Sequence, residues 1–142
     1  MPPPRDYIRL LLEGKAPPAP VMKLVGFSLK SAEPGRAVME FEADERHHNP
    51  GGTLHGGVLC DVADGAMGFA FASTLKEGEN FTTVELKINF LKAVKEGKLK
   101  AEGRVVKRGK TLSYIEADVT DEEGALIAKA SSTVMVLPGG SR

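Results

Sequence analysis

The sequence predicts an α+β domain in which a curved antiparallel sheet of five to six strands wraps around one long central helix. Residues 56–75 place apolar side chains on nearly every side of a helix, which is typical of a buried helix. Two strand-like segments precede it and four follow, and short glycine connections between the later ones favour antiparallel hairpins. An antiparallel sheet that covers a helix on most sides has to curl around it.

Size and composition indicate one soluble domain. The chain has 142 residues, of which 42% are hydrophobic and 27% charged. Nineteen basic and nineteen acidic residues give a formal net charge of zero, so neither nucleic acid nor a membrane is expected as a partner. Cys60 is the single cysteine and the N-terminus lacks the apolar run of a secretory signal, which favours a cytoplasmic protein.

The N-terminal residues 1–20 are expected to form an appendage to the main domain. Apolar residues in 7–12 predict a short helix, which ends at Gly14 before a proline-rich linker. The main domain is predicted to span residues 21–138, and residues 139–142 form a tail.

Two strands are predicted before the long helix. The first spans residues 24–29, and a turn at 33–35 leads to the second, in which the odd-numbered residues 37–43 are apolar. This alternation predicts one buried face. Residues 44–54 are rich in loop-forming residues and predict a long loop, of a length that is often functional.

Four strands are predicted after the long helix, and their segments are punctuated by glycines. In the first of them, Val84, Leu86, Ile88 and Phe90 alternate with polar residues and are expected to share the buried face. The four segments are residues 81–91, 99–107, 111–120 and 125–136.

The densest candidate site begins at the start of the long helix. Residues 49–57 read Asn-Pro-Gly-Gly-Thr-Leu-His-Gly-Gly. Glycines at this position leave the first backbone N–H groups of the helix uncovered, without partners inside the helix. Such groups can receive a negatively charged oxygen and could form an oxyanion hole. Alternatively, the two glycines simply allow the helix to pack closely against the sheet.

Asp64 is the second candidate. A carboxylate this deep in a buried helix is unfavourable unless it is hydrogen-bonded or faces a cavity, and capping cannot explain it. It is therefore either a structural carboxylate or a general base or nucleophile in a pocket. Asp61 lies one turn earlier and about 60° away around the axis, so the two are not expected to act as a pair.

The spacing of Gly56 and Asp64 predicts a site shared between two chains. Eight residues correspond to about 12 Å along one helix. A reacting carbonyl needs both the N–H donor and the base within about 3–4 Å. Two antiparallel copies of the helix in a symmetric dimer would bring the two groups together, and a monomer would be inactive.

Residues 49–57, with an aspartate nine residues after the histidine, resemble the hotdog-fold acyl-CoA thioesterases of the phenylacetic-acid-degradation (PaaI-like) group, within the 4-hydroxybenzoyl-CoA thioesterase superfamily. The resemblance covers roughly residues 24–136. It implies that Asp64 is the base or nucleophile and that Gly56 supplies the oxyanion-hole N–H. It also implies that Asn49 and His55 orient the thioester or water. A hydroxyl residue on the following strand assists in the family, and Thr83 rather than Thr82 is expected to face the site.

The resemblance further implies partners and a substrate. These are a homodimer whose sheets join edge to edge, commonly doubled to a homotetramer, and an acyl-CoA bound between subunits with no separate cofactor. Gly57 is a candidate for substrate binding. Lys107, Arg108 and Lys110 flank a hairpin turn and form either a solvated tip or a contact to the phosphates of CoA.

Other chemistry is less favoured by the sequence. His47, His48 and His55 lack a recognised zinc spacing, so no metal is expected. A Cys60–His55 nucleophile competes with the commoner buried structural thiol. The predicted function is thioester hydrolysis, and the alternatives are a non-catalytic acyl-CoA-binding module and an enoyl-CoA hydratase or dehydratase on the same scaffold.

Overall fold

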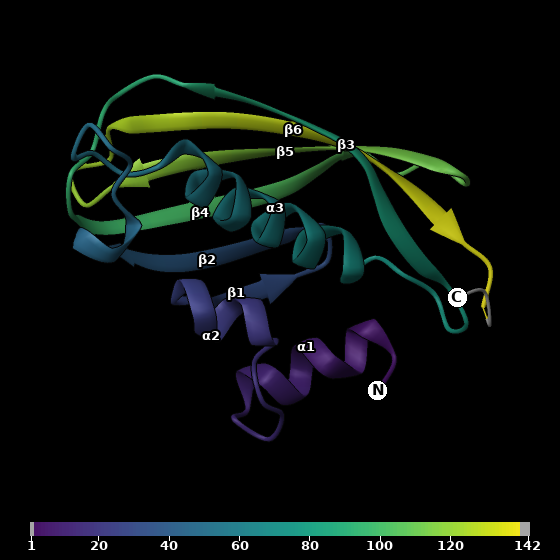
Figure 1. Ribbon diagram of the computed structural model, residues 1–142. Helices are drawn as coiled ribbons and strands as arrows, with labels where there is room; N and C mark the ends of the chain where they lie inside the picture. The colour runs from purple at the N-terminus through teal and green to yellow at the C-terminus, as the bar shows by residue number, and fades with distance from the viewer. Residues whose placement is uncertain (1, 140–142) are drawn as a thin grey trace.

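The computed structural model describes residues 2–139, and one long helix lies in the hollow of a six-stranded antiparallel sheet (Figure 1). This confirms the predicted fold class. The sheet order is β1-β2-β4-β5-β6-β3, so β3 and β1 are the two edges. The elements are α1 (Pro4–Leu12), α2 (Pro20–Val25), β1 (Phe27–Glu33), β2 (Arg36–Ala43), the 3-10 helix η1 (Glu45–His47), α3 (Gly56–Ala72), β3 (Asn80–Phe90), β4 (Gly97–Lys107), β5 (Leu112–Asp121) and β6 (Leu126–Leu137).

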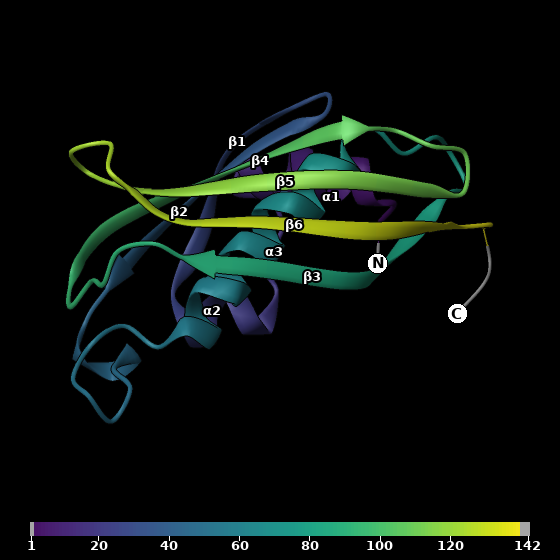
Figure 2. The ribbon, with the colours of Figure 1, turned by 90° about the horizontal axis from the view of Figure 1, so that it is seen from above.

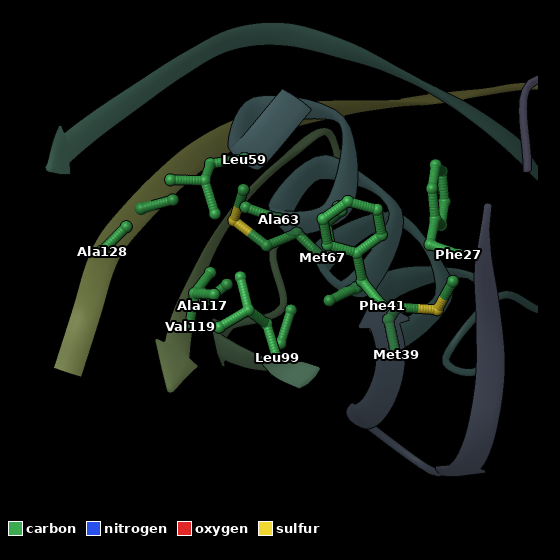
Figure 3. Packing of buried hydrophobic residues seen from close by; sticks show 14 of the residues in the cluster. Phe27, Met39, Phe41, Leu59, Ala63, Met67, Leu99, Ala117, Val119 and Ala128 are labelled. Atoms are coloured by element: carbon green, nitrogen blue, oxygen red, sulfur yellow. The ribbon is translucent and has the colours of Figure 1, made fainter. Parts of the chain in front are cut away.

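The core lies between α3 and the inner face of the sheet. Figure 3 shows residues from α3 among side chains of β2, β4, β5 and β6. The helix is apolar all round, as the sequence predicted, and Val62, Ala66 and Phe71 are fully buried. The labelled residues are Phe27, Met39, Phe41, Leu59, Ala63, Met67, Leu99, Ala117, Val119 and Ala128.

Gly103 on β4 lets α3 lie directly on the sheet. A Cβ at this position would stand 2.4 Å from the carbonyl oxygen of Ala66 and 2.8 Å from the backbone nitrogen of Met67. Both atoms belong to the backbone of α3, so no side-chain rotation relieves the clash. The position of α3, and therefore of every residue it carries, depends on this contact.

We expect Gly103→Ala to destabilise the protein by about 3 kcal/mol, because the whole helix must move away from the sheet to admit one methyl group. Gly68→Ala is the matched control. A Cβ there would meet only Phe81 Cζ, at 3.9 Å, and alanine favours a helix over glycine. Denaturant unfolding of the two variants measures the difference. Equal stabilities would contradict the close approach of β4 to α3.

The first predicted strand is partly wrong. Residues 24 and 25 belong to helix α2, and β1 starts only at Phe27. Pro20 occupies the first turn of α2, where its fixed φ suits a helix, and Gly26 ends the helix in the left-handed region at φ 94°. Six residues are too few to display a helical period. The segment 44–54, predicted as a loop, also contains η1, which the side chain of Asp44 caps.

The alternation predicted for β3 is wrong at Val84. The pairing with β6 shifts between Thr83 and Glu85, so Val84 is an extra residue in the strand and is 55% exposed. Thr83 pairs with Val134 and Leu86 pairs with Ser132, two buried residues of β6. The bulge therefore puts Thr83 on the inner face together with Leu86.

The N-terminal helix α1 packs against β1 and the C-terminal half of α3 (Figure 1). Ile8 is 7% exposed and joins the core, and the ring of Tyr7 stacks on that of Phe69. Of the predicted tail, residues 140–142 lie outside the described residues. Within residues 2–139, no helix has the combination of length and apolar character that spanning a membrane requires.

Candidate active site

Asp64 lies on the third turn of α3 and lines a groove between α3 and the first half of β3. The groove has a volume of about 870 Å³, and Gly68, Phe81 and Thr83 are among the residues that line it. Within residues 2–139, no backbone hydrogen bond is among the influences on the pKa of the Asp64 carboxylate. This geometry favours a carboxylate that faces a pocket over a structural one.

The surroundings of Asp64 raise its pKa above the ordinary value for aspartate. Desolvation by the surrounding protein is the largest cause, and the negative charge of Asp61 adds to it. A hydrogen bond from the Thr83 side chain opposes the shift. Asp64 keeps solvent access in the single chain, so the site is open to water while its carboxylate is more basic than usual.

The bulge in β3 decides which threonine faces Asp64. Thr82 pairs with Met135 and points to the outer face of the sheet, whereas Thr83 pairs with Val134 on the inner face. The structure therefore brings Thr83 and Asp64 together from two elements that are adjacent in the fold. Thr82 also borders the groove, but its hydroxyl is not among the groups that act on the Asp64 pKa.

The start of α3 presents one backbone N–H that makes no hydrogen bond within residues 2–139. His55 is the N-cap residue, and its Nδ1 accepts the backbone N–H of Gly57 at 2.8 Å. The Gly57 N–H is therefore already used, and we do not retain it as a substrate donor. The N–H of Gly56 has no acceptor within residues 2–139. With Nδ1 engaged as an acceptor, only Nε2 of the His55 ring is left to bond another group.

Phe90 at the end of β3 covers Gly56. A Cβ on Gly56 would lie 2.7 Å from Cζ of this ring, so any larger residue at position 56 would displace the ring. The ring itself remains 55% exposed in the single chain. Sequence alternation placed Phe90 on the inner face, but it carried no signal for a contact with the start of α3.

Asn49 organises the loop that leads into α3. Its Oδ1 accepts the N–H groups of Gly51 and Thr53, at 2.9 and 3.2 Å, and its Nδ2 donates to Thr53 Oγ1 at 2.9 Å. The amide is thus engaged within the loop of the single chain. Asn49 shares this loop with His55 and lies on the side of Gly56 rather than of Asp64.

The candidate residues divide into two half-sites. Asn49, His55 and Gly56 form the first, at the start of α3, and Asp64 with Thr83 forms the second, two turns further along. Gly56 and Asp64 stand about 12 Å apart along the helix, as expected from their spacing. One chain therefore does not present both half-sites to a single small group.

Arg108 is half-buried, and its side chain is engaged by neighbouring groups rather than free at the tip of its hairpin. Its Nη2 donates to Glu79 Oε2 at 2.8 Å, and its guanidinium carbon lies 4.9 Å from the centre of the Phe71 ring. These contacts occupy the groups that would bind a phosphate, so Arg108 does not offer a free guanidinium to CoA. Lys107 and Lys110 are exposed and remain available.

The other histidines and the cysteine have structural surroundings. His47 accepts the Asp44 N–H through Nδ1 and donates to the Val25 carbonyl through Nε2, and His48 Nε2 donates to the Lys95 carbonyl. Residues 2–139 contain no group of three His, Cys, Asp or Glu side chains that could hold a metal ion. Burial, followed by the charges of two aspartates, raises the pKa of the Cys60 thiol, which disfavours it as a nucleophile.

The sequence analysis missed the aromatic wall of the groove. Tyr7, Phe69 and Phe81 line it together with the small residues Gly68 and Ala72. Tyr7 lies in the segment treated as an appendage, and the aromatic residues are far apart in the sequence. Nothing in the local pattern indicates that they meet.

Comparisons with known proteins agree with this fold. The sequence pattern of the Thioesterase superfamily matches residues 51–128. A protein of Saccharolobus solfataricus named as a candidate esterase is 35% identical over 117 residues, or 82% of this chain and 83% of that protein. Acyl-coenzyme A thioesterase 13 of Homo sapiens is 33% identical over 108 residues, or 75% and 76%. The structure of a phenylacetic acid degradation-related protein from Ralstonia eutropha JMP134 has a TM-score of 0.83 and 26% identity, and the match covers 91% of this chain and 98% of that one.

Proposed function

The chain belongs to the thioesterase superfamily, and on this premise we propose that it hydrolyses the thioester of an acyl-CoA or aryl-CoA to the free acid and CoA. The resemblance drawn from residues 49–64 and the predicted hotdog fold are both confirmed. One observation carries the proposal for this chain. A carboxylate with a raised pKa lines a groove, while an unpaired N–H stands at the start of the same helix.

The division into half-sites supports a dimer that shares its active sites. β3 is an edge strand of eleven residues, and Figure 2 shows it with β6 on one side and no strand on the other. A long unpaired edge is a template for pairing with another chain. We propose that two β3 strands pair antiparallel. The two α3 helices would then also run antiparallel, with Gly56 of one chain beside Asp64 of the other.

The shared site can perform hydrolysis in a balanced sequence of steps. The Gly56 N–H receives the thioester oxygen, which becomes negative as the carbonyl carbon is attacked. Asp64 of the partner subunit either removes a proton from a water held by Thr83 or attacks the carbon itself. In the first case the deprotonated water attacks the carbonyl carbon. In the second case an anhydride forms and water opens it. In both cases the C–S bond breaks and CoA leaves as a thiolate, which takes up a proton given up by the water that is consumed.

The direct test is thiol release across acetyl-CoA, hexanoyl-CoA, hexadecanoyl-CoA and phenylacetyl-CoA. Turnover of at least one of these substrates is expected. Tight binding without thiol release would instead indicate an acyl-CoA-binding module. Hydration of crotonyl-CoA without hydrolysis would indicate a hydratase. Either outcome would overturn the proposed function.

The rate should depend on pH through Asp64. Because its pKa is raised, kcat/KM is expected to fall on the acid side with an inflection above about pH 4, the ordinary value for aspartate. Asp61→Asn removes a negative charge that favours the protonated form of Asp64. This variant should therefore keep its activity at neutral pH and show its acid inflection at lower pH. An inflection that does not move would contradict the influence of Asp61 on Asp64.

A further inference from the structure

We propose that helix α1 closes the far end of the acyl site and that Tyr7 limits the length of acyl chain accepted. The inference rests on the proposed function, because it assigns the groove beside Asp64 to the acyl part of the substrate. It concerns a segment outside the residues 51–128 that match the family pattern. The limit on acyl-chain length would thus be set by the N-terminal helix of this chain.

The groove has a polar end and an apolar end. Asp64 and Thr83 lie at the first, where a thioester carbonyl would react. From there the α3 side continues through Gly68 to Ala72, about 12 Å further along the axis, and the β3 side continues to Phe81. Small residues on one wall and an aromatic ring on the other leave room for an apolar tail. The shape and polarity suit the acyl chain of a substrate whose reacting carbon lies at Asp64.

Tyr7 stands at the apolar end in a fixed position. Its ring lies 6.4 Å from that of Phe69, centre to centre and nearly parallel, and its hydroxyl donates to the Pro17 carbonyl at 3.1 Å. The next residue, Ile8, is buried in the core and anchors the helix. The ring is therefore held from both sides and is a wall rather than a loose side chain.

Polar groups lie beyond the aromatic part of the groove. Glu79 and Asn80 line the groove next to Phe81, and the carboxylate of Glu79 pairs with Arg108. A tail that reached this part of the groove would contact the Glu79 carboxylate, and burying apolar surface against a charge gains little. We infer that short acyl chains and arylacetyl groups fit the groove, whereas long acyl chains are rejected.

The experiment compares acyl chain lengths within each variant. The wild type should have a higher kcat/KM for hexanoyl-CoA than for hexadecanoyl-CoA. The quantity to compare is the kcat/KM for hexadecanoyl-CoA divided by the kcat/KM for hexanoyl-CoA. Tyr7→Ala should raise this ratio by roughly tenfold, since pocket contacts of this size discriminate between substrates by about that factor. A ratio measured within one variant does not depend on the fraction of folded enzyme. An unchanged ratio would overturn the inference.

Two variants separate the ring from other effects. Tyr7→Phe keeps the ring and loses only the hydroxyl, so it should keep the preference of the wild type. Leu12→Ala removes an apolar side chain from the same helix outside the groove and should also leave the ratio unchanged. A shift in Leu12→Ala equal to that in Tyr7→Ala would mean that loosening of α1, rather than the Tyr7 wall, sets the preference.

Binding of non-hydrolysable S-alkyl-CoA thioethers separates this inference from the proposed function. The wild type should bind the hexyl thioether more tightly than the hexadecyl thioether, and Tyr7→Ala should reverse or remove that difference. If the wild type hydrolyses no acyl-CoA, the proposed reaction fails, while the thioether series still tests the wall. Equal effects of Tyr7→Ala on both thioethers would overturn the inference even in an active enzyme.

Discussion

Replacing Asp64 with asparagine is expected to lower kcat/KM for acyl-CoA hydrolysis by about a thousandfold, within the range attributed to a positioned general base. Asparagine keeps the size and polarity of the side chain but can neither accept a proton nor attack a carbonyl. Thr83 and the groove would remain in place. Thiol release under conditions of limiting substrate measures the loss.

Asp61→Asn is the matched control for this variant. It makes the same chemical change one turn earlier on α3, at an exposed position, and should keep the neutral-pH activity of the wild type. Comparable losses in both variants would point to a general electrostatic effect. Full activity of Asp64→Asn would remove the carboxylate from the mechanism altogether.

Stability should change in the opposite direction from activity in Asp64→Asn. The pKa of Asp64 is raised on folding, so between about pH 4 and the higher folded value the folded chain binds more protons than the unfolded one. Folding stability therefore falls as pH rises through this window and stays lower above it. Asparagine removes this penalty, so the variant should melt no lower than the wild type at pH 7. Below about pH 4 the gain in stability of Asp64→Asn over the wild type should vanish.

The sequence predicted the large elements of the fold because their patterns are long. The apolar circumference of α3 and the period-2 alternation of β2 both extend over enough residues to be read without structural information. Helix α2 was missed because six residues show no period. Val84 was misplaced because a bulge arises from the pairing with β6, which a single strand does not reveal.

The candidate site could likewise be predicted only where the signal is local in the sequence. Asp64 and Gly56 were found from local features, namely a charge in an apolar helix and glycines at its start. The engagement of Arg108 by Glu79 and the wall formed by Tyr7 depend on contacts between distant segments. Composition and residue spacing do not predict contacts between segments that are far apart in the sequence. The candidate reacting groups were therefore predictable from the sequence, whereas the groove proposed to bind the acyl chain was not.

Removing the backbone N–H of Gly56 is expected to lower activity by about a hundredfold or more, the effect of losing one oxyanion-hole donor. Gly56→Pro does this with little change to the helix. Proline suits the first helical position, and His55 before it has φ −64° and ψ 131°, which a residue preceding proline prefers. Gly56→Ala is the control, because it brings a Cβ against Phe90 in the same way but keeps the N–H. Equal losses of activity in Gly56→Pro and Gly56→Ala would mean that the contact with Phe90, rather than the missing N–H, causes the effect.

Pairing the two inactive chains then tests whether the site is shared. A heterodimer of one Gly56→Pro chain and one Asp64→Asn chain, isolated with two different affinity tags, contains one site in which both groups are native. It should recover about half of the wild-type activity. The reverse arrangement puts both substitutions on one chain beside a wild-type partner. Each of its shared sites then carries one substitution, so this heterodimer should be inactive. If each chain instead held a complete site, the first heterodimer would be inactive and the second would be half active, so the two arrangements give opposite results.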